Sequence, residues 1–153
     1  MALNMIKYNK SNFCLRGLMK GLKITSIITT VFLIVLELIP FSIKLNWVDS
    51  GGMSSTSYHS YFESIPWGRG VVGPLICAIL SVILLSLLLL SFFIENNKAF
   101  YITLCALPWL ALLGSLSAMI SGSYTLLGGI IGAVLIVLAE LIQFIYSKTF
   151  NKD

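Results

Sequence analysis

Four long apolar stretches alternate with polar segments along the chain. They cover residues 24–41, 71–94, 99–120 and 124–146, and none of them contains a lysine or an arginine. A helix of about 20 residues crosses a hydrocarbon core of about 30 Å, so each stretch is long enough to span a membrane. Short links between the second, third and fourth stretches favour antiparallel neighbours. The pattern predicts an all-α integral membrane protein built as an up-down four-helix transmembrane bundle.

The polar segments complete the division of the chain. Residues 1–23 form a basic N-terminal segment, 42–69 a long loop, and 147–153 a polar tail. Residues 42–48 alternate apolar and polar side chains as a strand does, and the glycine-rich residues that follow favour a turn. We therefore expect a small β-hairpin in the loop, which either caps the bundle or binds a partner. A loop of about 28 residues is too short for a second core, so the chain 1–153 is expected to form a single membrane domain.

Composition agrees with this interpretation. Hydrophobic residues make up 58% of the 153 residues and charged residues only 10%, and the mean hydropathy is +0.95. A soluble domain of this size could not bury so much apolar surface. The net charge of +4 comes from cations that gather beside the apolar stretches, where anionic lipid head groups attract them. We expect the lipid bilayer as a partner, and no nucleic acid.

The positive charges also predict an orientation. With four spans, eight of the ten lysines and arginines fall on one side of the membrane, and only Lys44 and Arg69 fall on the other. The eight are Lys7, Lys10, Arg16, Lys20, Lys23, Lys98, Lys148 and Lys152. The positive-inside rule then places both termini in the cytoplasm and the 42–69 loop outside, as in a multi-pass protein of the cell membrane.

Small residues gather on one side of the fourth stretch. Gly128, Gly129, Gly132 and Ala133 project to the same side of a helix, and the first and third of them form a GxxxG pair. The opposite arc holds large aliphatic side chains such as Ile131, which lipid solvates well. We expect the small face to pack into the bundle or against a second copy, as in a homo-oligomer or a membrane complex. Gly132→Leu should then destabilise the packing, whereas Ile131→Leu should be nearly silent.

Two acids lie within the apolar stretches. Glu37 and Glu140 are the only charged side chains there, and because hydrocarbon makes a charge costly, both are candidate functional residues. Glu140 shares the small face with Gln143 and lies roughly 9 Å inside the cytoplasmic end of its stretch, so it is the stronger candidate. Lys23 and Lys98 are the nearest candidates for a cationic partner. The alternatives are a proton- or cation-responsive site and a structural acid hydrogen-bonded to a neighbouring helix.

Fainter alignments of polar and small residues occur in the other stretches. At helical spacing, the aligned sets are Ser26, Thr30 and Glu37 in the first stretch, Pro74, Cys77, Ala78 and Ser81 in the second, and Ala111, Gly114, Ala118 and Ser121 in the third. Such faces are typical of contacts between membrane helices.

The chain shows no motif for catalysis, a cofactor or a metal. The three cysteines are Cys14, Cys77 and Cys105, and none lies in the long loop, so no disulfide framework is expected. His59 is the only histidine, and its surroundings in the sequence hold neither a ligand cluster nor a nucleophile with a base. We therefore expect no enzyme activity, no catalytic residue, no cofactor-binding residue, no cofactor and no metal site.

Several short runs carry a resemblance. The runs YHSYFE at 58–63, PWG at 66–68 and GPL at 73–75 resemble small four-span bacterial membrane proteins, and this resemblance implies no activity or site. The outline is also similar to small multidrug-resistance transporters, which have four spans and an acid in the first. They lack a long first loop, and Glu37 lies nearer the outer end than their acid. Claudin-like proteins share the four spans and a β-rich first loop, but this loop has no cysteine pair.

Together these features predict a small, non-enzymatic integral membrane protein that acts through helix packing and partner contacts. The alternative is an oligomeric transporter or channel that uses Glu140, or less favourably Glu37, as a proton- or cation-responsive site. A polar cavity that reaches Glu140 would favour transport, whereas a dry bundle with an exposed apolar loop would favour contacts.

Overall fold

The computed structural model describes residues 2–48, 51–63, 72–94, 97–123 and 125–150, with side chains from Gly17 onward apart from Trp47 and Met119. Its elements are α1 (Ala2–Leu38), β1 (Ile43–Val48), β2 (Ser54–His59), α2 (Val72–Leu90), α3 (Lys98–Ile120) and α4 (Leu126–Phe150). The predicted helical fold with a small two-stranded sheet is confirmed.

Each helix contains a segment that is long and apolar enough to cross a membrane. These segments are Gly17–Leu38, Val72–Leu90, Lys98–Ala118 and Leu126–Phe150. Their mean hydropathy lies between 1.8 and 2.7. Four such helices identify the chain as a multi-pass membrane protein.

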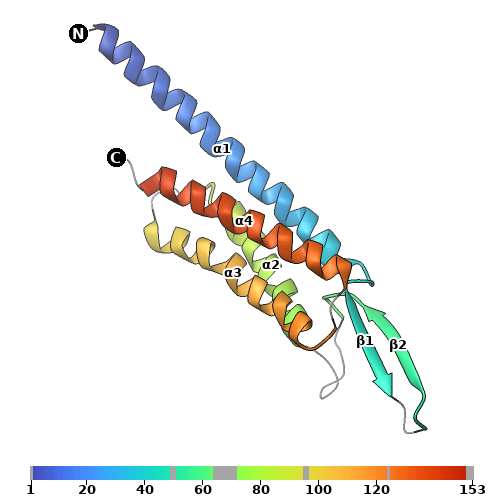
Figure 1. Cartoon of the computed structure of the whole chain (residues 1–153). Helices are drawn as coiled ribbons and strands as arrows, with labels where there is room; N and C mark the ends of the chain where they lie inside the picture. Colours follow the sequence, from blue (N-terminus) through green and yellow to red (C-terminus); the bar gives the residue numbers. More distant parts are fainter. Residues whose placement is uncertain (1, 49–50, 64–71, 95–96, 124, 151–153) are drawn as a thin grey trace.

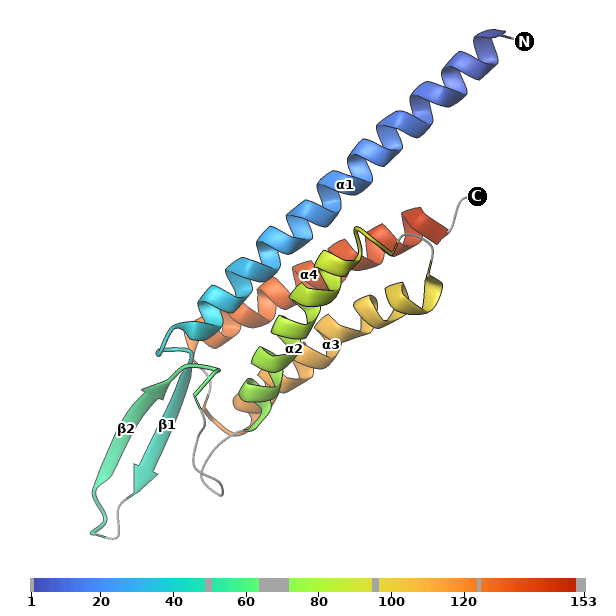
Figure 2. The same ribbon diagram turned by 180° about the vertical axis from the view of Figure 1, so that it is seen from behind.

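The helices form a ring in which each packs against two neighbours. α2 contacts α1 and α3, and α4 contacts α3 and α1. Figure 1 and the opposite view in Figure 2 show that successive helices alternate in direction, and that the N-terminal part of α1 extends beyond the ends of the others. The centre of the ring is filled by aliphatic side chains, among them Leu33, Leu84, Leu104, Leu135 and Ile142.

The first helix is longer than the apolar stretch predicted for it. It runs without a break from Ala2 to Leu38, so Gly17 and Gly21 do not interrupt it, and the basic segment continues directly into the span. The helix ends before the predicted boundary at residue 41 because Pro40 cannot continue it and disfavours the helical conformation of the preceding residue.

α2 and α3 approach each other closely at two glycines. A Cβ atom added to Gly114 would lie 2.7 Å from the carbonyl oxygen of Gly73 and 3.3 Å from the backbone nitrogen of Cys77. A Cβ added to Gly73 would overlap the Ser117 side chain and the Gly114 carbonyl oxygen. Only a glycine at each of these two positions lets the backbones meet in this way.

The small face predicted for α4 is largely on the outside of the bundle. The buried residues of α4 are Gly128, Ile131, Leu135, Leu138, Ala139, Ile142 and Ile145. Gly129 and Gly132 are only half-buried and Ala133 is exposed. The prediction that the large aliphatic arc faces lipid is wrong for Ile131, Leu135, Leu138, Ile142 and Ile145, which are buried in the bundle. Ile130 and Val137 of the same arc are exposed.

The two strands pair as an antiparallel hairpin, from Ile43 opposite His59 to Val48 opposite Ser54. Ile43 and Leu45 are buried and Asn46 is exposed, as the alternating pattern predicts. The hairpin projects from the end of the bundle where α1 ends and α4 begins (Figure 1, Figure 2).

The base of the hairpin is tied to the link between α3 and α4. The backbone N–H of Lys44 donates to the Ser123 carbonyl oxygen over 3.1 Å. The Thr125 hydroxyl donates to the Ser42 carbonyl oxygen over 2.7 Å. A Cβ on Gly128 would lie 3.3 Å from the same Ser42 oxygen, so this glycine serves a close approach to the loop rather than to a helix.

Candidate functional site

Glu37 is the acid that the fold buries. Its side chain is 0% exposed and lies between α1 and α2. The Ser81 hydroxyl is 2.8 Å from Glu37 Oε1, and the Cys77 thiol is 3.4 Å from the same oxygen. Both partners come from one face of α2, because they are four residues apart in a helix. The alignment of Cys77 with Ser81 in the sequence was the signal for this face, but nothing in the sequence paired it with Glu37.

The second carboxyl oxygen of Glu37 is unusual. Oε2 is buried and has no hydrogen-bond partner among the described residues, whereas buried polar atoms in proteins are nearly always paired. Ser81 can serve either charge state of the acid. Its hydroxyl donates to an ionised Glu37, or it accepts a hydrogen bond from a protonated Glu37 while its own proton turns to the Cys77 carbonyl oxygen at 3.1 Å. The geometry therefore allows Glu37 to take up or release a proton without moving either helix.

The backbone of Glu37 connects the acid to the loop. Its carbonyl oxygen accepts a hydrogen bond from the Tyr61 N–H over 2.9 Å. Tyr61 is 1% exposed, and its hydroxyl lies 3.0 Å from the Ser115 hydroxyl of α3. The chain that leaves the hairpin thus lies directly over the end of α1 that carries Glu37.

The other buried polar residues of α1 have separate, local partners. The Thr30 hydroxyl donates to the Ser26 carbonyl oxygen over 2.7 Å, and the Ser26 hydroxyl donates to the Leu22 carbonyl oxygen over 3.0 Å. Both hydroxyls therefore return to their own helix. The alignment of Ser26, Thr30 and Glu37 seen in the sequence is a buried face of α1, but the side-chain hydroxyls of Ser26 and Thr30 bond to carbonyl oxygens of their own helix and not to the Glu37 carboxyl group.

Lys23 lies at the opposite end of the same face. Its ammonium group donates to the Ser91 carbonyl oxygen over 2.6 Å and lies 5.5 Å and 5.7 Å from the ring centroids of Phe92 and Tyr101. A cation here interacts favourably with the C-terminal end of α2 and with the aromatic faces. The prediction that Lys23 is a partner for Glu140 is wrong, because these groups already hold it.

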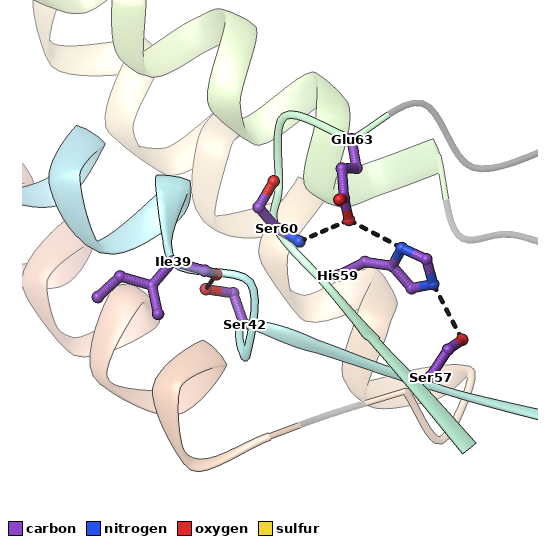
Figure 3. A network of polar contacts seen from close by, with 6 residues as sticks. All are labelled: Ile39, Ser42, Ser57, His59, Ser60 and Glu63. Atoms are coloured by element: carbon purple, nitrogen blue, oxygen red, sulfur yellow. Dashed lines mark hydrogen bonds and ion pairs between the residues drawn. The ribbon is translucent and has the colours of Figure 1, made fainter.

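A second polar network closes the base of the hairpin (Figure 3). His59 Nδ1 lies 2.8 Å from Glu63 Oε2, which also accepts the Ser60 N–H over 3.1 Å. His59 Nε2 lies 2.9 Å from the Ser57 hydroxyl. Hydroxyl, imidazole and carboxylate follow each other as in a hydrolase triad. In this structure the contacts join the end of β2 to the chain that follows it.

Figure 3 also shows how the chain turns after α1. The Ser42 hydroxyl donates to the carbonyl oxygens of Ile39 and Leu36 over 2.8 and 3.0 Å. These bonds satisfy carbonyls that the end of a helix leaves unpaired. They fix the direction in which β1 departs.

Glu140 and Gln143 lie on the outside of the bundle. Both side chains are exposed, and among the described residues neither makes a hydrogen bond or an ion pair. The prediction that they face inward is therefore wrong for the single chain. Together with the exposed Ala133 and Ile136 and the half-buried Gly129, they form one continuous strip, here named the exposed face of α4. Glu37 does not contribute to this face.

The unpaired polar groups set this face apart from the other exposed helix faces. The exposed hydroxyls of Thr25, Ser86 and Thr103 each donate to the carbonyl oxygen four residues earlier, over 3.0 to 3.1 Å. Such bonds stay within one helix and need no partner. Glu140 and Gln143 differ from these hydroxyls, because both are exposed on α4 and make no such bond to a described residue.

Glu140 is also far from both ends of its helix. It lies 14 residues after Leu126 and 10 before Phe150, which corresponds to about 21 and 15 Å along the axis. Helical side chains lean toward the N-terminus of their helix. The Glu140 side chain therefore leans away from the nearer end of α4, and this direction opposes escape of the carboxyl group to the membrane surface.

The predicted site residues thus separate into a buried acid on α1 and an exposed polar pair on α4. Sequence reasoning ranked Glu140 above Glu37 and did not find the roles of Tyr61 and Ser115. Comparison of the chain with protein-family models, curated proteins and solved structures found no match.

Proposed function

We propose that this protein is a non-enzymatic membrane subunit that acts through lateral contacts made by the exposed face of α4. The observation that carries the proposal is the exposed position of Glu140, about 15 Å from the nearer end of α4, with Gln143 one turn further along, neither paired with a described residue. A charged side chain at the centre of a membrane helix costs about 2.5–3.5 kcal/mol against lipid. A protein surface with polar groups at the same depth removes this cost.

The rest of the exposed face favours contact with another helix. Gly129 and Ala133 are small, which lets a second backbone approach, and they lie about three turns and two turns before Glu140 on the same strip. Ile136, which lies between Ala133 and Glu140 in the sequence, is 45% exposed and supplies apolar contact area. A face that combines close approach with unpaired hydrogen-bonding groups is typical of helices that assemble in membranes.

The proposal includes an orientation. We place both termini in the cytoplasm, since eight of the ten lysines and arginines then lie on that side. The hairpin is then outside the cell membrane, and the basic N-terminal part of α1 extends into the cytoplasm. The hairpin and this extension are further surfaces for the same complex.

Photo-crosslinking in native membranes tests the lateral contact. A photoreactive amino acid at Ile136 should give adducts with protein, whereas the same probe at Ile102, which is 52% exposed on α3, should label lipid. The two positions are matched in residue type and exposure, so the comparison isolates the face of the bundle. Lipid adducts alone at both positions would contradict the proposal.

A second candidate function rests on the buried Oε2 of Glu37, which has no partner among the described residues. In this alternative the protein is a proton- or cation-responsive transporter, with Glu37 rather than Glu140 as its acid. Glu37→Gln keeps the shape and the hydrogen bond to Ser81 but cannot exchange a proton. Proton flux into proteoliposomes that is lost in Glu37→Gln supports this function, and equal flux in both proteins excludes Glu37 from it.

A further inference from the structure

We propose that the exposed face of α4 binds the same face of a second copy of this chain, with Glu140 of each copy paired to Gln143 of the other. This inference rests on the proposed contact function and names its partner. It follows from three features of the face, which are its donor and acceptor content, its spacing along the helix and its small residues.

The polar groups of the face complement themselves. A carboxylate only accepts hydrogen bonds, whereas a glutamine amide has two N–H donors. Two Glu140 side chains facing each other would repel if ionised, but Glu140 opposite Gln143 gives an acceptor opposite a donor. In a twofold dimer each such pair occurs twice, because residue i contacts residue j and residue j contacts residue i.

The spacing of the two residues suits parallel helices. Two copies inserted with the same orientation have parallel α4 helices, related by a twofold axis along the membrane normal. Glu140 and Gln143 differ by about 4.5 Å along the helix axis, a step that two extended side chains bridge diagonally. All five members of the face lie within about 80° of one another at 100° per residue, so they meet one partner helix together.

A second copy also gives the small residues of this strip a contact. Ala133 is exposed and Gly129 is half-buried on the same strip as the polar pair, whereas Ile131 and Leu135 fill the interior of the bundle. In a dimer the small residues bring the two α4 backbones together on one side of the polar pair. On the exposed faces of α2 and α3, by contrast, the hydroxyls of Ser86 and Thr103 bond within their own helices.

Disulfide crosslinking of the purified full chain in liposomes tests the geometry. The three native cysteines are replaced by alanine, and a single cysteine is placed by Ala133→Cys on the exposed face or by Leu113→Cys on α3. Leu113 is 64% exposed and Ala133 is exposed as well, so both positions are accessible. Oxidation should link Ala133→Cys chains into dimers and leave Leu113→Cys chains monomeric. Equal crosslinking at both positions, or none at Ala133→Cys, overturns the proposal.

Substitutions then test the polar pair by dimer fraction, measured by energy transfer between labelled chains at a series of protein-to-lipid ratios. Glu140→Leu and Gln143→Leu should each lower the association constant at least about tenfold, because two hydrogen-bonded pairs vanish from each dimer. Glu140→Gln should stay within about threefold of the unaltered protein, since an amide still pairs with an amide. Thr103→Val, at an exposed hydroxyl on α3, is the matched control and should change nothing.

The folded state survives these changes, since Glu140 and Gln143 are exposed in the single chain and leucine is solvated well by lipid. Dimers that persist in Glu140→Leu would overturn the pairing. If the purified protein is monomeric at all protein-to-lipid ratios and the probe at Ile136 still labels a different protein in native membranes, the second copy is not the partner. The proposed contact function then still holds. If the probe at Ile136 labels only lipid, both the dimer and the contact function are rejected.

Discussion

The contact between Gly73 and Gly114 predicts a difference between two chemically identical substitutions. Gly114→Ala adds a Cβ that would lie 2.7 Å from the Gly73 carbonyl oxygen and 3.3 Å from the Cys77 nitrogen. Gly132→Ala adds a Cβ whose nearest neighbour is Leu112 Cδ1 at 3.7 Å, an ordinary van der Waals distance. Both glycines lie inside membrane helices, α3 and α4.

The two substitutions differ only in what the new methyl group meets. Replacing glycine by alanine favours a helix by about 1 kcal/mol in either position, so this term cancels in the comparison. At Gly114 the methyl group meets backbone atoms, which cannot rotate away, and α2 and α3 must separate by several tenths of an ångström. Overpacking of this kind costs about 1–3 kcal/mol. Gly132→Ala should leave the free energy of unfolding unchanged or increase it. The free energy of unfolding of Gly114→Ala should be lower than that of Gly132→Ala by about 1–3 kcal/mol.

Reversible unfolding in detergent mixtures measures the two free energies of unfolding side by side. Gly73→Ala should resemble Gly114→Ala, because its Cβ would overlap Ser117 and the Gly114 carbonyl oxygen. Equal stability of Gly114→Ala and Gly132→Ala would refute the assignment of the tight contact to α2 and α3. If Gly132→Ala lowers the free energy of unfolding more than Gly114→Ala does, the glycine face of α4 is instead the main packing surface inside the bundle.

Three further outcomes follow from the described contacts. Glu37→Gln should unfold at nearly the same denaturant concentration as the unaltered protein. Glu37→Leu should lower the free energy of unfolding by about 0.6–1.7 kcal/mol, because the hydrogen bond to Ser81 disappears. Equal losses in the two variants would show that this bond contributes nothing. Lys23→Met should lower the thermal midpoint, since the Ser91 carbonyl oxygen loses its ammonium donor, and an unchanged midpoint would refute this role. In cysteine-free protein, an impermeant thiol reagent should label Ser55→Cys from outside intact cells and miss Ser147→Cys, and the opposite pattern would reverse the proposed orientation.

The sequence alone determined the features that depend on local pattern. Four apolar stretches give four helices, because in hydrocarbon a backbone must satisfy its own hydrogen bonds, and only the helix does so within one segment. The alternation through Ile43 and Leu45 gives a strand with one buried side. Pro40 gives the end of α1, since proline cannot continue a helix. Each of these conclusions needs only residues that are neighbours in the chain.

The tertiary structure alone decided which side of each helix faces inward. In a soluble protein the buried side is the apolar side, but lipid is as apolar as leucine, so hydrophobicity does not separate the interior of a membrane bundle from its surroundings. Shape decides instead. Ile131 fills the interior and Ala133 does not, although the presence of small residues on one side of α4 suggested the reverse.

The same reason explains the exchange of roles between the two acids. Glu37 and Glu140 look alike in the sequence, and only the partner helices distinguish them. α2 brings Ser81 to Glu37 and buries it, whereas Glu140 is exposed and has no hydrogen bond or ion pair with a described residue. Hydrogen bonds between helices join residues far apart in the chain, here 44 positions for Glu37 and Ser81, and their existence depends on how four helices pack rather than on any one of them.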